Sequence, residues 1–263
     1  MQTVKGVNMN YNNFVGFDDN KELLPKGFDT FDSEFKLRQL FLHLSNFVLS
    51  STCSFNKYEQ RIFVKLPLKV AFESKIRTLL PQCNVKMKNI HKNKKFNICI
   101  NSTKIINNYI STKTKQIILV NSKNLLPVAK LISHCFVNNK IQLLIDKNLL
   151  FHEFVLEKLK KLHKDKEVKD LGNSISIKQK DVCALKIYTS WKSIQRKNPN
   201  IQSEVDNAIK VINKGEFNQV YLIYPKDSDF TRHIPVYVDE LKYKTYQIKA
   251  IPYSLRSIIR KNI

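Results

Sequence analysis

The residues with the clearest chemical signal are lysines, and they gather in the middle of the chain. Five of them lie close together around His91: Lys86, Lys88, Lys92, Lys94 and Lys95. Closely spaced ammonium groups neutralise phosphate, so this segment is predicted to contact DNA. It belongs to a longer stretch, from Ser74 to Ile145, that holds thirteen Lys and Arg and no Asp or Glu. Because a solvated surface normally mixes both signs, this stretch favours a nucleic-acid or acidic-protein partner.

The charge of the whole chain agrees with a polyanionic partner. The 263 residues include 45 Lys and Arg but only 22 Asp and Glu, which gives a net charge of +23. An AT-rich genome would raise the content of Lys and Asn, but the codons of Asp and Glu suit such a genome equally well. The shortage of acids therefore calls for a physical reason, and DNA supplies one. Only seven of the cations are Arg, which favours non-specific neutralisation of phosphate over bidentate reading of guanine.

Several common catalytic and binding motifs are absent from the sequence. The five glycines, at positions 6, 16, 27, 172 and 215, are too far apart for a G-x-G-x-x-G or Walker A loop. If the protein works with a nucleotide, a partner protein is therefore expected to bind it. There is no G-x-S-x-G or H-E-x-x-H sequence, and the five cysteines are scattered singly, so neither a zinc site nor a disulfide framework is expected. No apolar run reaches the ~20 residues of a membrane span, and no export signal begins the chain; we expect a cytoplasmic protein without a membrane partner.

Composition divides the chain into three parts. Residues 1–33 are interpreted as a flexible acidic lead-in, residues 34–139 as a basic helical and mixed region, and residues 140–263 as one compact domain. In the basic region, apolar spacing predicts a helix from Ser33 to about Ser51 and a second from Pro67 to Leu80, which Pro81 ends. The other elements predicted there are strands at Arg61–Leu66, Val85–Lys88, Phe96–Ile100 and Gln116–Val120, and helices at Thr103–Ile110 and Leu125–Phe136.

The last part alternates predicted strands and helices, which indicates the α/β class. The predicted strands are Lys140–Ile145, Ser174–Lys178, Val182–Trp191, Gln219–Tyr224 and Tyr243–Ile251. The predicted helices are Leu149–Leu162 and Gln202–Asn213, and Lys164–Gly172 is interpreted as a charged connector.

Four segments of this last part resemble, in the same order, the McrC family, the nuclease subunit of McrBC-type 5-methylcytosine restriction systems. Leu144–Val155 (L-I-D-K-N-L-L-F-H-E-F-V) looks like the family's strand that ends in Asp and opens a helix. Ile187–Lys192 (I-Y-T-S-W-K) resembles its D-T-K-W-K strand, and the helix that begins Q-S-E-V-D-N follows it. Val220–Lys226 (V-Y-L-I-Y-P-K) is similar to its Y-L-I-Y-P-K strand, and Ile248–Leu255, which contains I-P-Y-S-L, is similar to its closing strand and the P-x-x-L end of that strand.

The resemblance covers roughly residues 140–258 and implies a restriction-endonuclease-like mixed sheet flanked by helices, of the PD-(D/E)xK class. Before it, composition and apolar spacing predict a mainly helical, basic N-terminal part. Such a centre holds a divalent metal, Mg²⁺, between carboxylates on adjacent strands and keeps a lysine beside the attacking water. The family also implies a McrB-like AAA+ GTPase as partner and modified DNA as substrate. This interpretation requires the strands of Tyr188 and Tyr221 to be neighbours in one sheet.

The sequence departs from the family at the decisive positions. Tyr188 and Ser190 stand where the resemblance expects the metal-binding Asp and the catalytic Lys, and Asp181 would be the preceding catalytic Asp. The candidate catalytic residues are therefore Asp181, Glu153 and Lys192, with Asp181 and Glu153 as metal ligands if the protein is active. Lys186 is a second candidate to replace the lost lysine. One carboxylate with remote helpers makes a poor magnesium site, so an inactive centre is the favoured interpretation.

Three functions remain open on the sequence alone. The first is a McrC-like, DNA-binding component of a modification-dependent restriction system, either an active magnesium-dependent endodeoxyribonuclease subunit or a degenerate one. The second is a non-catalytic nucleic-acid-binding or scaffold protein. The third, suggested by lysine abundance alone, is an RNA-binding or ribosome-associated protein.

Overall fold

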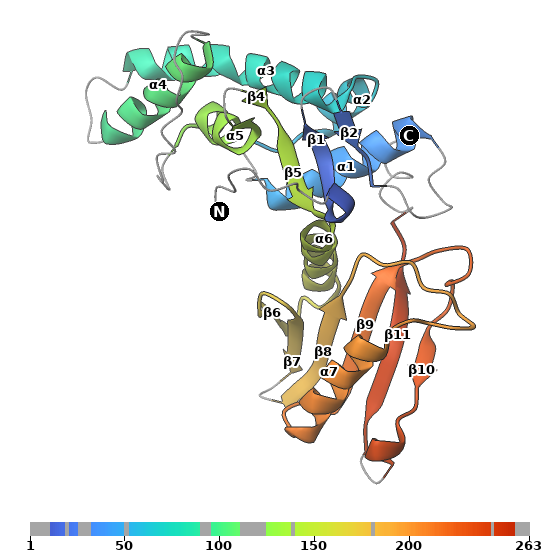
Figure 1. Cartoon of the computed structure of the whole chain (residues 1–263). Coiled ribbons are helices and arrows are strands. Elements are labelled where there is room, and N and C mark those ends of the chain that lie inside the picture. Colours follow the sequence, from blue (N-terminus) through green and yellow to red (C-terminus); the bar gives the residue numbers. More distant parts are fainter. Residues whose placement is uncertain are drawn as a thin grey trace. The chain divides into compact units, whose positions relative to one another are not determined.

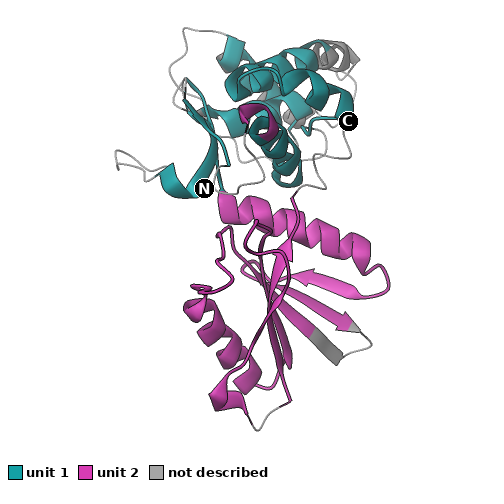
Figure 2. Cartoon of the chain, turned by 90° about the vertical axis from the view of Figure 1, so that its right-hand side faces the viewer, with its two compact units in different colours: residues 1–25, 37–146 teal, residues 26–36, 147–263 magenta. Residues whose placement is uncertain are grey.

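The computed structural model describes residues 11–18, 21–25, 33–49, 53–89, 96–110, 125–137, 140–179, 182–242 and 245–255. The chain divides into two compact units, one of residues 1–25 and 37–146 and the other of residues 26–36 and 147–263 (Figure 2). The longer segment of the second unit begins at Lys147, and the sequence placed the beginning of the last domain at Lys140. No helix among the described residues is long and apolar enough to cross a membrane.

The first unit contains most of the helices (Figure 1). They are α1 (Glu34–Val48), whose first three residues belong to the other unit, α2 (Lys57–Phe63), α3 (Leu68–Asn89), α4 (Phe96–Ile110) and α5 (Pro127–Cys135). The short helix η1 (Tyr11–Asn13) leads into strand β1 (Phe14–Asp18), which pairs antiparallel with β2 (Lys21–Leu23) and β5 (Leu143–Asp146). Strands β3 (Phe136–Val137) and β4 (Lys140–Ile141) form a separate antiparallel pair.

Several predictions for this unit were wrong. The predicted strand at Arg61–Leu66 overlaps α2, which begins with a capping box: Asn56 accepts a hydrogen bond from the Glu59 N–H, and Glu59 accepts one from the Asn56 N–H. The predicted strands at Val85–Lys88 and Phe96–Ile100 are the end of α3 and the start of α4. Short apolar runs do not distinguish a strand from a buried helix, and α3 continues through Pro81 rather than ending there.

The lead-in also proved to be structured where it is described. Strand β1 places Val15 and Phe17 in the core, each 1 % exposed, and the Phe17 ring lies 5.3 Å from the ring of Phe72. Gly16 adopts a positive φ of 133°, and a β-carbon there would collide with the Leu143 carbonyl of β5. The acidic residue Glu22 is an anchor, because its carboxylate accepts hydrogen bonds from Arg38 and from the backbone N–H of Leu68, where α3 begins.

The second unit is a mixed six-stranded sheet with two long helices, which confirms the predicted α/β class. Its elements are α6 (Lys147–Leu162), β6 (Glu167–Asp170), β7 (Ile175–Gln179), β8 (Val182–Thr189), α7 (Gln202–Asn213), β9 (Gln219–Pro225), β10 (Ile234–Val236), the short helix η3 (Asp239–Leu241) and β11 (Gln247–Tyr253). The strand order is β10-β11-β9-β8-β7-β6, with β8, β9 and β11 parallel to one another. Strand β6 lies in the segment predicted as a charged connector. It was not predicted because its residues are mostly charged and exposed, which is typical of an edge strand.

The central pairing of this sheet confirms the requirement set by the sequence. Ile187 of β8 pairs with Tyr221 of β9, and Tyr188 pairs with Leu222, so the two tyrosine segments are neighbouring strands. Successive side chains of a strand point to opposite faces. Ile187 and Thr189 therefore share one face of the sheet, and Lys186 and Tyr188 share the other.

The two helices cover opposite faces of the sheet. On the Thr189 face, Phe154 of α6 contacts the Tyr253 ring at 6.2 Å. On the Tyr188 face, α7 buries an apolar core against β9 and β11, with Val205, Ala208 and Ile212 packed near Val220 and Ile248. Figure 1 shows α7 lying along β8 and β9. At the end of β8, Thr189 therefore faces α6, whereas Tyr188 faces α7.

Candidate functional site

A buried histidine joins three elements at the end of β8. His152, on α6, is 6 % exposed. Its Nδ1 lies 3.0 Å from Oγ1 of Thr189, the last residue of β8, and its Nε2 lies 3.1 Å from Oδ1 of Asp170, the last residue of β6. The contacts tie the helix to an inner strand and to the edge strand. They also connect a hydroxyl, an imidazole and a carboxylate in one chain of contacts.

The charge of Asp170 fixes how this chain of groups is arranged. The backbone N–H of Gly172 donates to Asp170 Oδ1 at 2.7 Å and lowers the pKa of the carboxyl; burial works against this, and His152 adds to it. With a proton on His152 Nε2, the Asp170 carboxylate accepts it, and an Nδ1 without a proton can then accept from the Thr189 hydroxyl. A hydroxyl, a base and an orienting acid in this order are the groups that activate a nucleophile in hydrolases. The same order of groups also occurs in hydrogen-bond networks that only stabilise a fold.

Glu153 follows His152 on α6, and the pKa of its carboxyl is raised, whereas that of Asp170 is lowered. Glu153 is half-buried, and burial raises the pKa of its carboxyl; the charges of Asp170 and Glu157 raise it further, while His152 and Lys160 lower it. Two carboxyls near one histidine thus have pKa values shifted in opposite directions. Such pairs occur in active sites where one group acts as acid and the other as base. The predicted residue Glu153 thus lies in the electrostatic environment of His152 and Asp170.

Lys192 lies elsewhere, with α7. Its Nζ contacts the carboxylate of Glu204 at 3.2 Å and donates to the backbone carbonyl of Asn200, both at the start of α7. The described contacts of Lys192 and those of Glu153 therefore belong to helices that pack on opposite faces of the sheet. Ser190, at the position expected for lysine, donates its backbone N–H to the Ile223 carbonyl at 3.1 Å.

Tyr188, at the position expected for a metal-binding Asp, points to the face of α7. Burial raises the pKa of its phenol, and its ring lies 5.8 Å from the ammonium of Lys186. A protonated phenol under an ammonium group is not a ligand set for Mg²⁺, which prefers several oxygens near octahedral geometry. Among the residues that the structure describes, no group of three His, Cys, Asp or Glu side chains could hold a metal. The described side chains here do not fit a magnesium centre.

Some predicted residues fall outside the described ranges. Asp181 lies between Gln179 and Val182, which pair with each other where β7 is followed by β8. Val182 and Thr189 are opposite ends of β8, about 23 Å apart at the rise of a strand. Lys92, Lys94 and Lys95 are outside the described residues, and the side chains of Lys86 and Lys88 in α3 are as well. Their predicted contacts with DNA, and the role of Asp181 as catalytic residue and metal ligand, stay predictions.

The sequence did not point to His152, Asp170 or Thr189. Their separations of 18 and 37 residues match no motif, and a single His on the apolar face of a helix is usually a core residue. A local signal did exist in Asp170-Leu-Gly172, because an aspartate that accepts the N–H of a glycine two residues on is a common turn.

No protein-family model matches this chain, and no curated protein matches it. Among solved structures it is similar to a chain of a half-complex from the tetradecameric assembly of Thermococcus gammatolerans McrB AAA+ hexamers with bound McrC, at 10 % identity and a TM-score of 0.35. The likeness covers 52 % of this chain and 38 % of that one, so this chain matches well under half of the other's length.

Proposed function

We propose that this protein is a McrC-like, DNA-binding component of a restriction system in which the nuclease centre is altered. The observation that supports it best is the position of the resembling segments in the fold. Leu144–Val155 covers the end of β5 and the first half of α6, and β5 ends at Asp146 as the resemblance requires. The other three segments fall on β8, β9 and β11, which are adjacent parallel strands of one sheet. Unrelated matches would have no reason to assemble in this way.

The alteration of the centre follows from the chemistry at the end of β8. Metal-dependent cleavage of a phosphodiester needs carboxylates that hold the ion and a cation beside the attacking water. The expected Asp and Lys are Tyr188 and Ser190, and Lys192 is engaged with Glu204. On the α6 face, both ring nitrogens of His152 already have protein partners, Thr189 and Asp170. We therefore do not expect this chain alone to cleave DNA with Mg²⁺. We expect it to bind DNA instead.

The division of labour with a partner follows from the motifs. The net charge of +23 provides affinity for phosphate through release of counterions. The chain has no glycine loop that cradles a nucleotide phosphate. A McrB-like GTPase would supply nucleotide hydrolysis, and this protein would supply contacts to DNA.

The test has two arms, both with the full-length protein. In the first, binding of a fluorescent 30-base-pair duplex is measured between 50 and 300 mM salt, and a steep linear fall of log affinity with log salt is expected; a flat response overturns DNA binding. In the second, the protein and a McrB-like GTPase are applied together to a sizing column with GTP, where co-elution is expected. Separate elution at micromolar concentrations of both proteins overturns the proposed partnership.

The altered centre is tested with supercoiled plasmid and Mg²⁺, without the partner. No nicking above the protein-free control is expected. Nicking that disappears in Asp181→Ala and persists in Asp206→Ala, an exposed acid of α7, would establish a rebuilt active centre instead. RNA of matched length serves as competitor, and clear preference for RNA would favour the RNA-binding alternative.

A further inference from the structure

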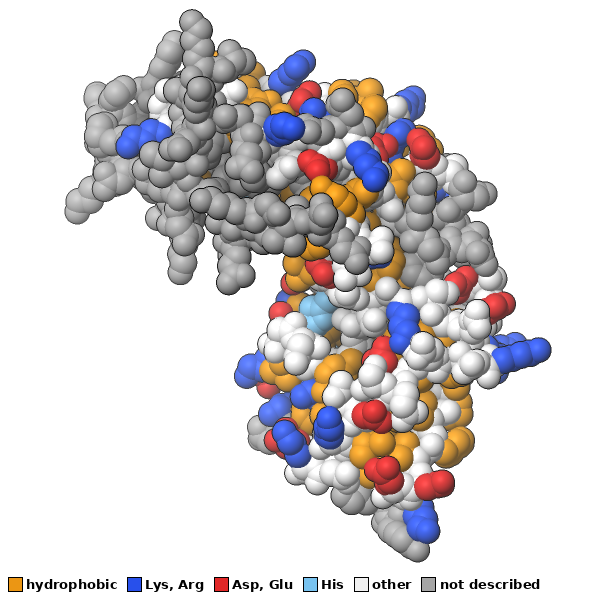
Figure 3. Space-filling view, in the orientation of Figure 1, with side chains coloured by type: hydrophobic (Ala, Val, Ile, Leu, Met, Phe, Trp, Pro, Cys, Tyr) orange, Lys and Arg blue, Asp and Glu red, His pale blue; other side chains and the backbone are white. Residues whose placement is uncertain are grey.

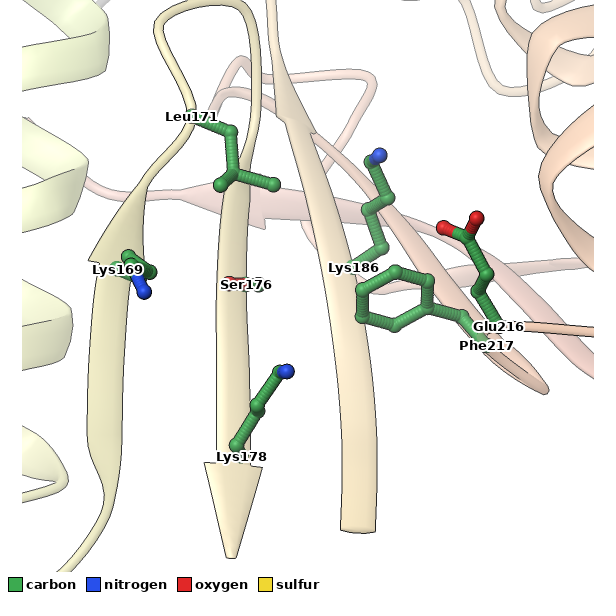
Figure 4. Close-up of a pocket in the computed structure, with 7 residues that line it drawn as sticks. All are labelled: Lys169, Leu171, Ser176, Lys178, Lys186, Glu216 and Phe217. Carbon is green, nitrogen blue, oxygen red and sulfur yellow. The ribbon is translucent and has the colours of Figure 1, made fainter. Parts of the chain in front are cut away.

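Three lysines line a hollow on the α7 face of the sheet, beside the helix rather than under it. The hollow, of about 390 Å³, is bordered by β6, β7 and β8 and by the turn after α7. Its lining residues are Lys169, Leu171, Ser176, Lys178, Lys186, Glu216 and Phe217 (Figure 4). In Figure 3 several Lys and Arg side chains lie over the same edge of the sheet, with acidic side chains among them, and others lie elsewhere on this unit. None of these residues belongs to the His152 network, which lies on the α6 face.

The register of the sheet brings the three ammonium groups to one surface. Ser176 of β7 pairs with Lys169 of β6 on one side and with Lys186 of β8 on the other. Neighbouring strands are about 4.8 Å apart, so the two lysine backbones are about 10 Å apart. Lys178 lies two residues beyond Ser176 and points to the same face. Ser176, 2 % exposed, forms the floor between the three cations.

Two carboxylates lie near the three ammonium groups: Glu216 in the lining, and Glu167, which is directly opposite Lys178 in the register of β6 and β7. Lys169 has Glu167 at 3.8 Å, but both side chains are more than 60 % exposed, where an ion pair contributes little. Within the described residues, no carboxylate lies within 4.0 Å of Lys178 or Lys186. Lys186 is held instead over the rings of Phe217, at 5.3 Å, and Tyr188, at 5.8 Å. Glu216 is the one acid of the lining.

No two of the three lysines are directly opposite each other in the register of the sheet, but the three cations share this surface with only two nearby carboxylates, Glu167 and Glu216. A ligand with closely spaced negative charges would offset the remaining positive charge. The lining contains no Asn or Gln to read adenine and no planar Arg fork to read guanine, whereas its three ammonium groups are point charges suited to phosphate oxygens. The hollow is therefore better suited to phosphates than to bases.

We infer that the hollow formed by Lys169, Lys178 and Lys186 binds the phosphodiester backbone of DNA without reading its sequence. The choice of DNA rests on the proposed function; the preference for a phosphate backbone rests on the hollow itself. The residues of the hollow differ from those of the predicted lysine segment around His91, which the sequence places in the other unit. Lys186, which the sequence suggested as a replacement for a catalytic lysine, thereby acquires a binding role.

The test compares two triple variants that lose the same charge. One is Lys169→Gln, Lys178→Gln, Lys186→Gln; the control is Lys197→Gln, Lys210→Gln, Lys226→Gln, three exposed lysines elsewhere in the unit. Each lysine that contacts phosphate contributes about one to the slope of log affinity against log salt. The hollow variant should lose about 2 to 3 from the slope and bind duplex DNA at least about tenfold more weakly in 100 mM salt, whereas the control should lose less than one.

Further arms separate the outcomes. Lys→Arg at the same three positions should keep the slope, and circular dichroism melting shows whether each variant folds. Equal slopes for the hollow variant and the control overturn this inference and leave DNA binding intact. A wild-type protein without salt-dependent affinity overturns DNA binding itself. Single-stranded DNA and RNA of the same length identify the source of the phosphate: a loss confined to RNA overturns the assignment to DNA.

Discussion

His152 Nδ1 lies 3.0 Å from Thr189 Oγ1, at the end of the strand where the family resemblance expects a metal-binding centre. The contact joins α6 to β8, and the second ring nitrogen of His152 joins both to Asp170 on β6. A polar network of this kind stabilises the fold only while every member has a partner. Its removal is therefore informative about both structure and chemistry.

Thr189→Val keeps the shape of the side chain but removes the hydroxyl. It should lower the free energy of unfolding by about 1–3 kcal/mol, because the buried Nδ1 of His152 loses its partner. Thr189→Ser retains a hydroxyl and should lose less. Urea denaturation followed by tryptophan fluorescence measures both, since Trp191 packs against Phe151 of α6 at 5.9 Å. Equal stability of the wild type and the Val variant would show that the hydrogen bond contributes nothing.

Asp170→Asn is expected to act in a pH-dependent way. The pKa of Asp170 is lowered in the folded protein, chiefly by the Gly172 N–H. Its charged form therefore adds stability above the unfolded-state pKa, and that stability is lost as pH falls through the folded-state pKa. The variant should melt below the wild type at pH 7, and the two melting curves should converge in acid below the ordinary range of Asp. A gap that stays constant with pH would indicate lost packing instead of lost charge.

Glu153→Gln should have the opposite sign. Burial raises the pKa of Glu153, so the folded state favours its protonated form. The stability from this group is present below the unfolded-state pKa and is lost as pH rises through the folded-state pKa. At pH 7 the uncharged Gln should make the protein more stable than the wild type, with the difference shrinking towards acid pH. Glu157→Gln, which removes contacts to Lys160 and Lys161 at 3.8 and 3.7 Å, is the matched control on the same helix and should not stabilise. A less stable Glu153→Gln protein at pH 7 would mean that the charge is needed there.

The sequence predicted the second unit better than the first, for a physical reason. Strands such as Gln219–Pro225 carry long apolar runs with aromatic residues, and α7 has a clear apolar stripe, so local patterns match the final structure. In the first unit, β1 is stabilised by pairing with β5, more than a hundred residues later, which no local pattern encodes. The same limit hid the candidate site. Its three residues come from α6, β6 and β8, and only the register of the sheet brings them together.

Two tyrosines in the second unit should respond in opposite ways to the loss of their hydroxyl groups. The Tyr224 hydroxyl is buried with no hydrogen-bond partner among the described residues, and burial raises the pKa of its phenol, so it stays protonated. Because an unpaired buried hydroxyl costs free energy, Tyr224→Phe should leave the unfolding free energy unchanged or raise it by up to about 1–2 kcal/mol. The Tyr246 hydroxyl, by contrast, accepts the Val238 N–H at 2.8 Å and donates to the Val238 carbonyl at 3.2 Å. Tyr246→Phe should therefore destabilise by about 1–2 kcal/mol. Chemical denaturation of both variants gives the comparison, and a destabilised Tyr224→Phe protein would reveal that this hydroxyl has a partner, such as a bound water, that stabilises the end of β9.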